Sequence, residues 1–317
     1  MGDNNLRTHK LGWIGTGRMG FALAERLLDA GCDLAIYNRT RSKAEPLAEK
    51  GGKIVDSPSG LADRDIVFTI VAGDKDFREV TIGLNGVLSQ QGAAPEILID
   101  STTISANVSA EVRKVGEANG TRLIAAPVSG NPFVVRSGKL TLVVSGPDEA
   151  FQTAKPYLDL LGAGCTYVGD GDAARLAKIC HNLMLGVVTQ SMAEITVLAE
   201  KAGLSRSAFL EFLNKSVMGS VFTRYKTPAF VNLDYHPTFT PVLLRKDFDL
   251  GLEAARELGV PMPVAALVHE VIQEVIGRGS RDQDFAVMLE HQARASGLEL
   301  EPENVEVSDG LEADKGP

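Results

Sequence analysis

A helical pattern over residues 169–201 is the feature that most constrains how this chain can fold. Its side chains are apolar on almost every face of the expected helix, and a helix that is apolar all round must be buried. With a rise of ~1.5 Å per residue, a helix of this length spans the diameter of a small domain. We therefore expect it to pass through the middle of the protein.

Lys178 and Asn182 interrupt this apolar run. They are four positions apart, so their side chains lie about one turn apart on the same face of the helix. One interpretation is a lysine at the edge of a core helix, with a buried stem and an ammonium group that reaches water. The other is a proton donor with an orienting amide at a domain junction. The helical pattern alone fits both.

The composition is that of a soluble globular protein, and the chain is long enough for two domains. The chain has 317 residues, is 44% hydrophobic and 23% charged, and carries a formal net charge of −9. A negative field disfavours nucleic acid and anionic membranes as partners. A small anionic ligand would therefore have to be bound by local cations or by backbone N–H groups.

The cysteine residues and the N-terminal sequence indicate the expected cellular compartment. Cys32, Cys165 and Cys180 are scattered and lack the spacing of a metal site or a CxxC motif, so we expect reduced, buried thiols and no metal. The first residues contain no apolar run of signal-peptide type, and no stretch reaches eighteen consecutive apolar residues. We expect a cytoplasmic protein without a membrane span.

A glycine-rich turn separates the first expected strand, residues 11–14, from a helical pattern. Glycines let the backbone turn tightly and approach a pyrophosphate at the helix N-terminus, where unpaired N–H groups and the helix dipole favour anions. In this context the motif favours dinucleotide binding over a purely structural turn. The residues of the turn are Gly15, Thr16, Gly17, Arg18, Met19 and Gly20.

The end of the second expected strand favours NADP over NAD. Dinucleotide folds that bind NAD usually place an acid here to hold the ribose 2′-hydroxyl, but this chain has Asn38, Arg39 and Thr40. Asn38 and Thr40 can form hydrogen bonds, whereas Arg39, with Arg41 and Lys43 behind it, can pair with a 2′-phosphate. A solvated basic cluster is the alternative.

Strand and helix patterns alternate up to about residue 168, which predicts an α/β fold with a doubly wound, mostly parallel sheet. Ligands of such sheets bind at the carboxyl edge of the strands. The glycine turn, Val71, Ala72 and Thr102 all fall at that edge. Residues 127–132 form a turn-rich stretch whose Ser129 hydroxyl and free N–H groups could bind a carboxylate, although a plain connecting loop fits the same pattern.

The second half of the chain shows helical patterns with almost no strand signal. The expected organisation is a dinucleotide-binding domain at 10–168, a long interdomain helix at 169–201, an all-helical domain at 202–295 and a disordered acidic tail at 296–317. The helices of the second half are apolar enough that one subunit would not cover them. This favours a homodimer or a homotetramer.

Five stretches together resemble the β-hydroxyacid dehydrogenases, the family of 3-hydroxyisobutyrate, tartronate semialdehyde and glyoxylate/succinic semialdehyde reductases. They occur in the family's order, and the resemblance covers nearly all of residues 10–294. The stretches are the glycine turn with Met19, IDSTTIS at 99–105, APVSG at 126–130, GDAARLAKICHN at 171–182 and KDFDLGLEAA at 246–255.

This resemblance implies roles for particular residues. It places Thr102 against the cofactor and makes Lys246, from the helical domain, the start of a second cofactor motif that would close over the nucleotide. It also makes Lys178 the catalytic proton donor or acceptor, with Asn182 fixing the substrate or the lysine. His181 and His236 are rival acid–base groups by residue type, and we expect both to be structural.

The family's substrate loop is matched with departures. Ser129 and Gly130 correspond to residues that hold the substrate carboxylate, whereas Asn131 replaces a glycine and would narrow or redirect the loop. Ala126 follows an alanine where the family usually has aspartate, and Ala72 replaces a common proline.

The resemblance implies hydride transfer between a nicotinamide cofactor and a small 3-hydroxy acid, or the semialdehyde or oxo acid that corresponds to it. Two alternatives from other classes stay open: imine reduction on the same fold, and a dinucleotide-binding sensor or scaffold without catalysis. Relatives that reduce imines tend to lack the lysine, so Lys178 disfavours the first. The retention of Lys178 with Asn182 disfavours the second. A methyltransferase that uses the glycine turn is a more distant possibility.

Overall fold

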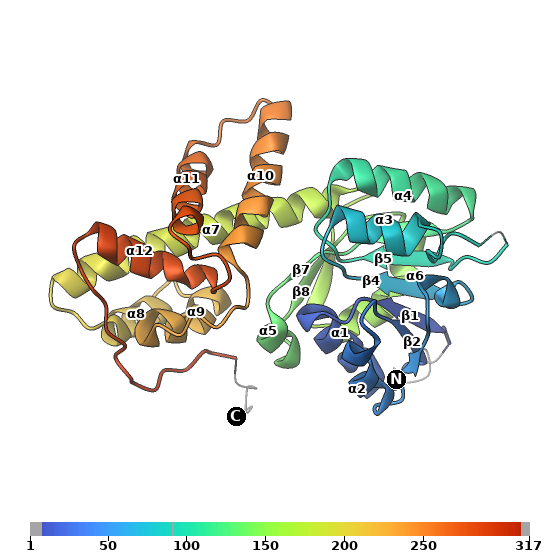
Figure 1. Cartoon of the computed structure of the whole chain (residues 1–317), viewed down its shortest axis with the longest axis horizontal. Helices are drawn as coiled ribbons and strands as arrows, with labels where there is room; N and C mark the ends of the chain where they lie inside the picture. The colour runs from blue at the N-terminus through green and yellow to red at the C-terminus, as the bar shows by residue number, and fades with distance from the viewer. Residues whose placement is uncertain (1–7, 91, 312–317) are drawn as a thin grey trace. The chain divides into compact units, whose positions relative to one another are not determined.

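The structure, a computed structural model, describes residues 8–90 and 92–311 (Figure 1). It divides into two compact units, residues 1–178 and 179–317. The division falls within the long helix α7 (Ala173–Lys201), so Lys178 is the last residue of the first unit and Asn182 belongs to the second.

The first unit contains the expected parallel sheet. Its order is β3-β2-β1-β4-β5-β6, so the chain builds outward from β1 in one direction and then crosses to build in the other. The junction of β1 and β4 is thus the switch point at which doubly wound sheets bind ligands. The strands are β1 (Leu11–Ile14), β2 (Leu34–Tyr37), β3 (Lys53–Ile54), β4 (Ile66–Thr69), β5 (Ile97–Asp100) and β6 (Arg122–Ala125).

The register of this sheet aligns the ends of its central strands. Ile14 is paired with Tyr37 on one side and with Thr69 on the other, and Thr69 is paired in turn with Asp100. Every residue of β1, β4 and β5 is buried, as in parallel sheets that are covered on both faces. The residues that follow these strands therefore meet at one carboxyl edge.

Helices cover this sheet. Among them α1 packs against α5 and α6, while α3 packs against α4. The helical segments of the unit before α7 are α1 (Arg18–Asp29), η1 (Arg41–Lys43), α2 (Glu45–Ala48), η2 (Pro58–Leu61), α3 (Asp74–Ile82), α4 (Ala106–Ala118), α5 (Pro132–Arg136) and α6 (Asp148–Leu160).

A second, three-stranded sheet was not expected. It has the order β7-β8-β9, with β7 (Val128–Ser129) antiparallel and β9 (Gly164–Tyr167) parallel to β8 (Thr141–Val144). The strand signal around residues 139–146 belongs to this sheet. Strand β9 has the sequence GCTY and no fully buried residue. It therefore lacks the apolar run by which a strand is recognised in a sequence.

The second unit is all-helical, as expected. Its helices after α7 are α8 (Arg206–Lys215), α9 (Val221–Asn232), α10 (Pro241–Glu257), α11 (Pro263–Gly277), η3 (Phe285–Val287) and α12 (Met288–Ala295). Helices α7 and α10 approach closely at two glycines. A Cβ on Gly186 would lie 2.5 Å from the Phe248 ring, and one on Gly251 would lie 2.7 Å from Leu183.

The prediction that the long helix is buried on every face is wrong. It buries a stripe that includes Met192 and Val197, but Met184 is 68% exposed and Leu198 is 70% exposed. An apolar sequence therefore marks both the core face of α7 and an uncovered face. By length and composition alone α7 could cross a membrane, a test that the core helix of a soluble protein also meets.

The thiols also differ from expectation. All three cysteines are free, but only Cys32 is buried, whereas Cys165 is half-buried and Cys180, on α7, is exposed. Burial raises the pKa of Cys165, and a hydrogen bond to Asp159 adds to this effect, so that the pKa reaches about 11.

The prediction of a disordered tail is wrong for residues 296–311, and residues 312–317 lie outside the described residues. The Glu303 carboxylate accepts hydrogen bonds from the backbone N–H groups of Arg206 (2.5 Å) and Ser207 (3.1 Å) at the start of α8. The Asn232 side chain exchanges two hydrogen bonds with the backbone of Val305. The acidic composition suggested a solvated tail, but one of its acids caps a helix.

Candidate active site

The glycine turn has the geometry of a close backbone crossing. Gly15 has φ +99°, and a Cβ on it would lie 2.1 Å from the Ile70 carbonyl oxygen. A Cβ on Gly20 would lie 2.0 Å from the Gly15 carbonyl oxygen. Both positions therefore require glycine so that α1 can pack against the β1–β4 junction.

Gly17 differs from these two glycines because, apart from its immediate chain neighbours, no described atom lies within 4 Å of the position of its Cβ. It is the N-cap of α1, and glycine has no side chain with which to satisfy the first N–H groups of the helix. The side chains of Arg18, which is exposed, and Met19, which is half-buried, follow in the first turn. The turn thus presents helix N–H groups on a side where the backbone can be approached closely, as a pyrophosphate site requires.

The Asn38 side chain connects this turn to the end of β2 through two hydrogen bonds. Its Oδ1 accepts a hydrogen bond from the Thr16 backbone N–H at 2.8 Å, and its Nδ2 donates to the Thr40 carbonyl at 2.8 Å. The Thr16 hydroxyl is buried and has no hydrogen-bond partner among the described residues. A buried polar group of this kind calls for a partner, and a bound nucleotide would supply one, so these residues fit a dinucleotide.

The basic residues after β2 have acidic partners that the sequence pattern did not reveal. Arg39 lies 2.8 Å from Asp76, at the start of α3, and Arg41 lies 2.5 Å from Asp56. Both arginine side chains are more than half exposed, so both pairs are open to solvent and weak.

The predicted residues at the ends of β4 and β5 do come together. The Val71 backbone N–H donates to the Thr102 hydroxyl at 3.1 Å, Thr102 is buried, and Ala72 is exposed next to Val71. The Thr102 backbone N–H in turn donates to Asp100 at 3.1 Å.

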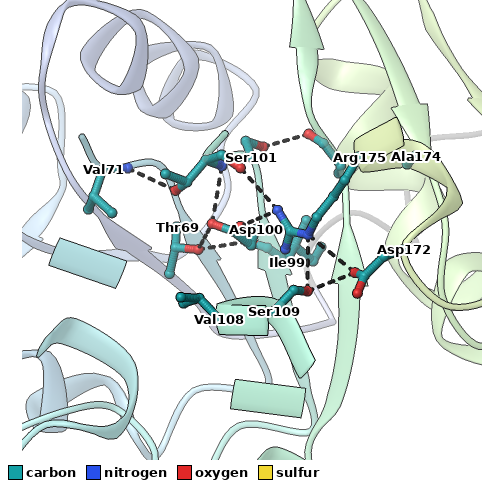
Figure 2. A network of polar contacts seen from close by, with 12 residues as sticks. Thr69, Val71, Ile99, Asp100, Ser101, Val108, Ser109, Asp172, Ala174 and Arg175 are labelled. Carbon is teal, nitrogen blue, oxygen red and sulfur yellow. Dashed lines mark hydrogen bonds and ion pairs between the residues drawn. The ribbon is translucent and has the colours of Figure 1, made fainter. Parts of the chain in front are cut away.

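Asp100 and Arg175 are polar core residues that the sequence analysis missed. Asp100 is 0% exposed and Arg175 is 8% exposed, and they form an ion pair of 2.8 Å. Figure 2 shows the Arg175 guanidinium directed at Asp100, with Ser109 and Asp172 on its other side. The only local sign of this pair in the sequence was Asp100, an acidic residue at the end of an apolar strand.

The loop after β6 places the predicted substrate residues in one turn. Ser129 ends β7, and Gly130 has φ +140°, a conformation that favours glycine. Asn131 is buried and is the N-cap of α5, where its Oδ1 accepts from the backbone N–H groups of Phe133 (2.9 Å) and Val134 (3.0 Å). This capping explains an asparagine at position 131 without a substrate, and direct substrate contact by Asn131 stays a prediction.

Lys178 and Asn182 lie on α7, where Lys178 is half-buried and Asn182 is buried. The Asn182 amide donates to Asp247 at 2.5 Å, and its Oδ1 lies 2.9 Å from His181 Nδ1. Asp247 is 2% exposed, follows the predicted cofactor residue Lys246 on α10, and was missed as a site residue. Within the second unit, this carboxylate fixes the orientation of the Asn182 amide.

Comparisons with known proteins agree with this architecture. Residues 10–169 match the family described as the NAD binding domain of 6-phosphogluconate dehydrogenase, and residues 171–292 match the family described as NAD-binding of NADP-dependent 3-hydroxyisobutyrate dehydrogenase.

Individual relatives cover the chain over most of its length. An uncharacterized oxidoreductase of Shewanella frigidimarina is 36% identical over 88% of this chain and 97% of its own. The glyoxylate/succinic semialdehyde reductase 1 of Arabidopsis thaliana is 30% identical over 89% and 97%. The structure of Mycobacterium tuberculosis 3-hydroxyisobutyrate dehydrogenase with L-serine has a TM-score of 0.76 and 26% identity, and the match covers 89% of this chain and 98% of that one.

The doubly wound sheet, the glycine turn and the helical second unit define an NAD(P)-dependent oxidoreductase. Within that class, the chain belongs to the β-hydroxyacid dehydrogenase family, whose members transfer a hydride between NAD(P)(H) and small hydroxy acids or their oxo counterparts.

Proposed function

We propose that this enzyme uses NADP(H) in preference to NAD(H) and that Lys178 is its proton donor and acceptor. The observation that carries the proposal is the place of Lys178 in the nucleotide-binding unit. Arg175, three residues earlier on α7, donates to the Thr102 carbonyl at 3.0 Å. Thr102 lies beside Val71 at the same strand edge as the glycine turn.

The bound nicotinamide supplies or accepts the hydride. During reduction, the Lys178 ammonium donates a proton to the carbonyl oxygen as it becomes a hydroxyl; during oxidation, the neutral amine accepts that proton. A lysine is protonated at neutral pH unless its surroundings lower its pKa. Proton donation to an aldehyde or oxo acid is therefore the direction that needs least adjustment.

The other predicted residues hold the reactants. Ser129 and Gly130 bind the substrate carboxylate through the serine hydroxyl and backbone N–H groups of the loop. Asn182, whose amide is held by Asp247, orients the substrate or the lysine, and Lys246 contacts the cofactor. Such positioning of reacting groups is worth several orders of magnitude in rate.

The preference for NADP rests on Arg39 and on the absence of an acid at positions 38–40. Arg39 is 75% exposed at its side chain, so its weak pair with Asp76 leaves the guanidinium within reach of a 2′-phosphate.

A substrate panel tests the proposal. Glyoxylate, succinic semialdehyde and methylmalonate semialdehyde are supplied with NADPH or NADH, and cofactor oxidation is followed by absorbance. We expect turnover of at least one of these acids, with a higher kcat/KM for NADPH than for NADH. Turnover of a cyclic imine but of none of the acids would contradict the proposal and favour imine reduction. NADPH binding without any turnover would indicate a sensor or scaffold.

A further inference from the structure

A buried ion pair joins the end of β5 to the first turn of α7. Arg175 Nη1 lies 2.8 Å from Asp100 Oδ2, and both residues belong to the first unit. A buried carboxylate needs a charged partner or several hydrogen-bond donors, since burial without them is costly. Asp100 and Arg175 therefore hold each other in place.

The same pair fixes the conformation of Thr102. Asp100 Oδ1 accepts from the Thr102 backbone N–H (3.1 Å) and from the Thr69 hydroxyl (2.7 Å), and Arg175 Nη1 donates to the Thr102 carbonyl (3.0 Å). The Thr102 hydroxyl accepts from the Val71 N–H. The backbone N–H, the backbone carbonyl and the hydroxyl of the predicted cofactor contact are thus all engaged by the network.

A second set of contacts holds Arg175 from the side of α4. Its Nε donates to the Ser109 hydroxyl (3.0 Å) and lies 3.2 Å from Asp172 Oδ1 (Figure 2). Arg113 donates to that same oxygen at 2.8 Å. The start of α7 is therefore tied both to the end of β5 and to α4.

We propose that Arg175 is a positioning residue for the reaction. Lys178 follows Arg175 by three residues, which is ~4.5 Å along the helix axis. By binding Asp100 and the Thr102 carbonyl together, Arg175 sets the register of Lys178 against the cofactor edge of the sheet. The inference rests on the proposed role of Lys178. It adds that the Arg175 contacts position the Lys178 side chain.

A double variant separates positioning from simple stabilisation. Asp100→Asn with Arg175→Met removes both charges together, so no unpaired charge is left in the core, and a buried pair replaced in this way often leaves a protein folded. The asparagine keeps an oxygen that can accept from Thr69 and Thr102, so the cofactor contact is retained. The contacts of the Arg175 guanidinium with the end of β5, with Ser109 and with Asp172 are lost, whereas Asp172 keeps its ion pair with Arg113.

A matched control is available in the second unit. Arg206 is 1% exposed and binds both oxygens of Glu200, at 2.6 Å and 2.7 Å, far from the nucleotide-binding residues in the sequence. Glu200→Gln with Arg206→Met removes the ion pair of a buried arginine with a half-buried carboxylate, the nearest counterpart in the second unit. It should lower the melting temperature without a specific effect on catalysis.

The readouts are kcat, NADPH affinity and amide exchange. For the Asp100/Arg175 double variant we expect kcat on the best acid of the panel to fall about 100-fold, because small misplacements of reacting groups cost that much. The Kd for NADPH, from its fluorescence, should change less than about threefold. Amide exchange should accelerate over residues 173–178. The primary deuterium isotope effect on kcat should rise as chemistry becomes slower.

The outcomes are distinguishable. A folded double variant with the kcat of the wild type, or an equal loss in the Glu200/Arg206 control, would overturn the positioning role. If the double variant does not fold, Arg175→Lys is tested instead. A lysine keeps the positive charge but cannot contact several acceptors at once as the planar guanidinium does. We expect about a tenfold lower kcat with near-native stability. Wild-type kcat in Arg175→Lys would also overturn the role. A wild-type enzyme without turnover on the panel would refute the proposed function, and this inference with it.

Discussion

At the residue scale, the proposed preference for NADP depends on whether Arg39 exchanges its pair with Asp76 for one with the 2′-phosphate. Its present partner is a single half-buried carboxylate, Asp76, at 2.8 Å, and the Arg39 side chain itself is largely exposed. A 2′-phosphate carries more charge and offers three acceptor oxygens. Arg39 is therefore expected to exchange its pair with Asp76 for one with NADP, and Asp76 is expected to compete with the cofactor.

Substitution of these two residues should move NADP affinity in opposite directions. Arg39→Ala should lower kcat/KM for NADPH about tenfold and leave the value for NADH nearly unchanged, because only NADPH has the 2′-phosphate. Asp76→Asn should lower KM for NADPH. Steady-state kinetics with both cofactors measure this, and Arg78→Ala, which breaks an exposed pair with Glu111, is the control. Equal losses for both cofactors in Arg39→Ala would refute the assignment.

Asp247, Asp100 and Arg175 show why site residues were missed at this scale. The Asn182–Asp247 contact joins positions 65 residues apart, and Arg175 meets Thr102 across 73 residues. Such pairs leave no local periodicity or spacing in the sequence. All three residues lie inside the motifs that carry the family resemblance, but their roles depend on partners that only the fold brings together.

At the scale of elements, the glycine turn offers two positions with opposite consequences. Gly15→Ala would place a Cβ 2.1 Å from the Ile70 carbonyl at a positive φ, so we expect a loss of stability of about 2–4 kcal/mol. Gly17→Ala has space for its Cβ in the protein and should fold normally, but its methyl group faces the expected path of the pyrophosphate.

Thermal unfolding and NADPH titration check this pair of variants. We expect Gly15→Ala to lower the melting temperature, and Gly17→Ala to weaken NADPH binding at least about tenfold with an unchanged melting temperature. Normal NADPH affinity in Gly17→Ala would place the nucleotide elsewhere.

The sequence predicted most strands of the large sheet and the all-helical class of the second unit, although no helical pattern was identified over α9. The buried strands are continuous apolar runs that end at glycine or polar residues, and such runs can be read directly. Strand β9 and the order of residues 296–311 could not be read. The strand is held by pairing with β8 and the tail by Arg206, Ser207 and Asn232, all of which are contacts at a distance.

The tail contact predicts a pH dependence. Burial alone would raise the Glu303 pKa, but hydrogen bonds from Ser207 and from the N–H groups of Ser207 and Arg206 outweigh it and lower the pKa below its ordinary value. This stabilisation is therefore fully present above the ordinary carboxyl pKa and is lost as the pH falls through the lowered value.

Glu303→Gln should lower the melting temperature at pH 7, and the difference from the wild type should shrink progressively below about pH 4.5. Glu306→Gln, an exposed acid in the same segment, should have little effect at any pH. Melting temperatures across pH for the three proteins measure this. Identical behaviour of the two variants would mean that the Glu303 contacts do not stabilise the fold.

At the scale of the whole molecule, the uncovered apolar face of α7 favours self-association. Met184 and Leu198 are more than two-thirds exposed on a helix whose other face is part of the core. Large apolar side chains that remain exposed in this way mark interaction surfaces. A homodimer or a homotetramer would cover them.

Light scattering with size-exclusion chromatography tests this prediction. The wild type should have at least twice the mass of one 33.8 kDa chain, and Leu198→Glu should shift it toward the monomer because a charge would be buried in the interface. A monomeric wild type at micromolar concentration would contradict the prediction.

The central claim is that Lys178 transfers the proton that accompanies hydride transfer, and Lys178→Ala tests it most directly. Its kcat for NADPH-dependent reduction of the preferred acid should fall at least about 1,000-fold, within the range ascribed to positioned acid catalysis, while the NADPH Kd stays within about threefold of the wild type. Turnover of Lys178→Ala at more than about a tenth of the wild-type kcat would contradict the account.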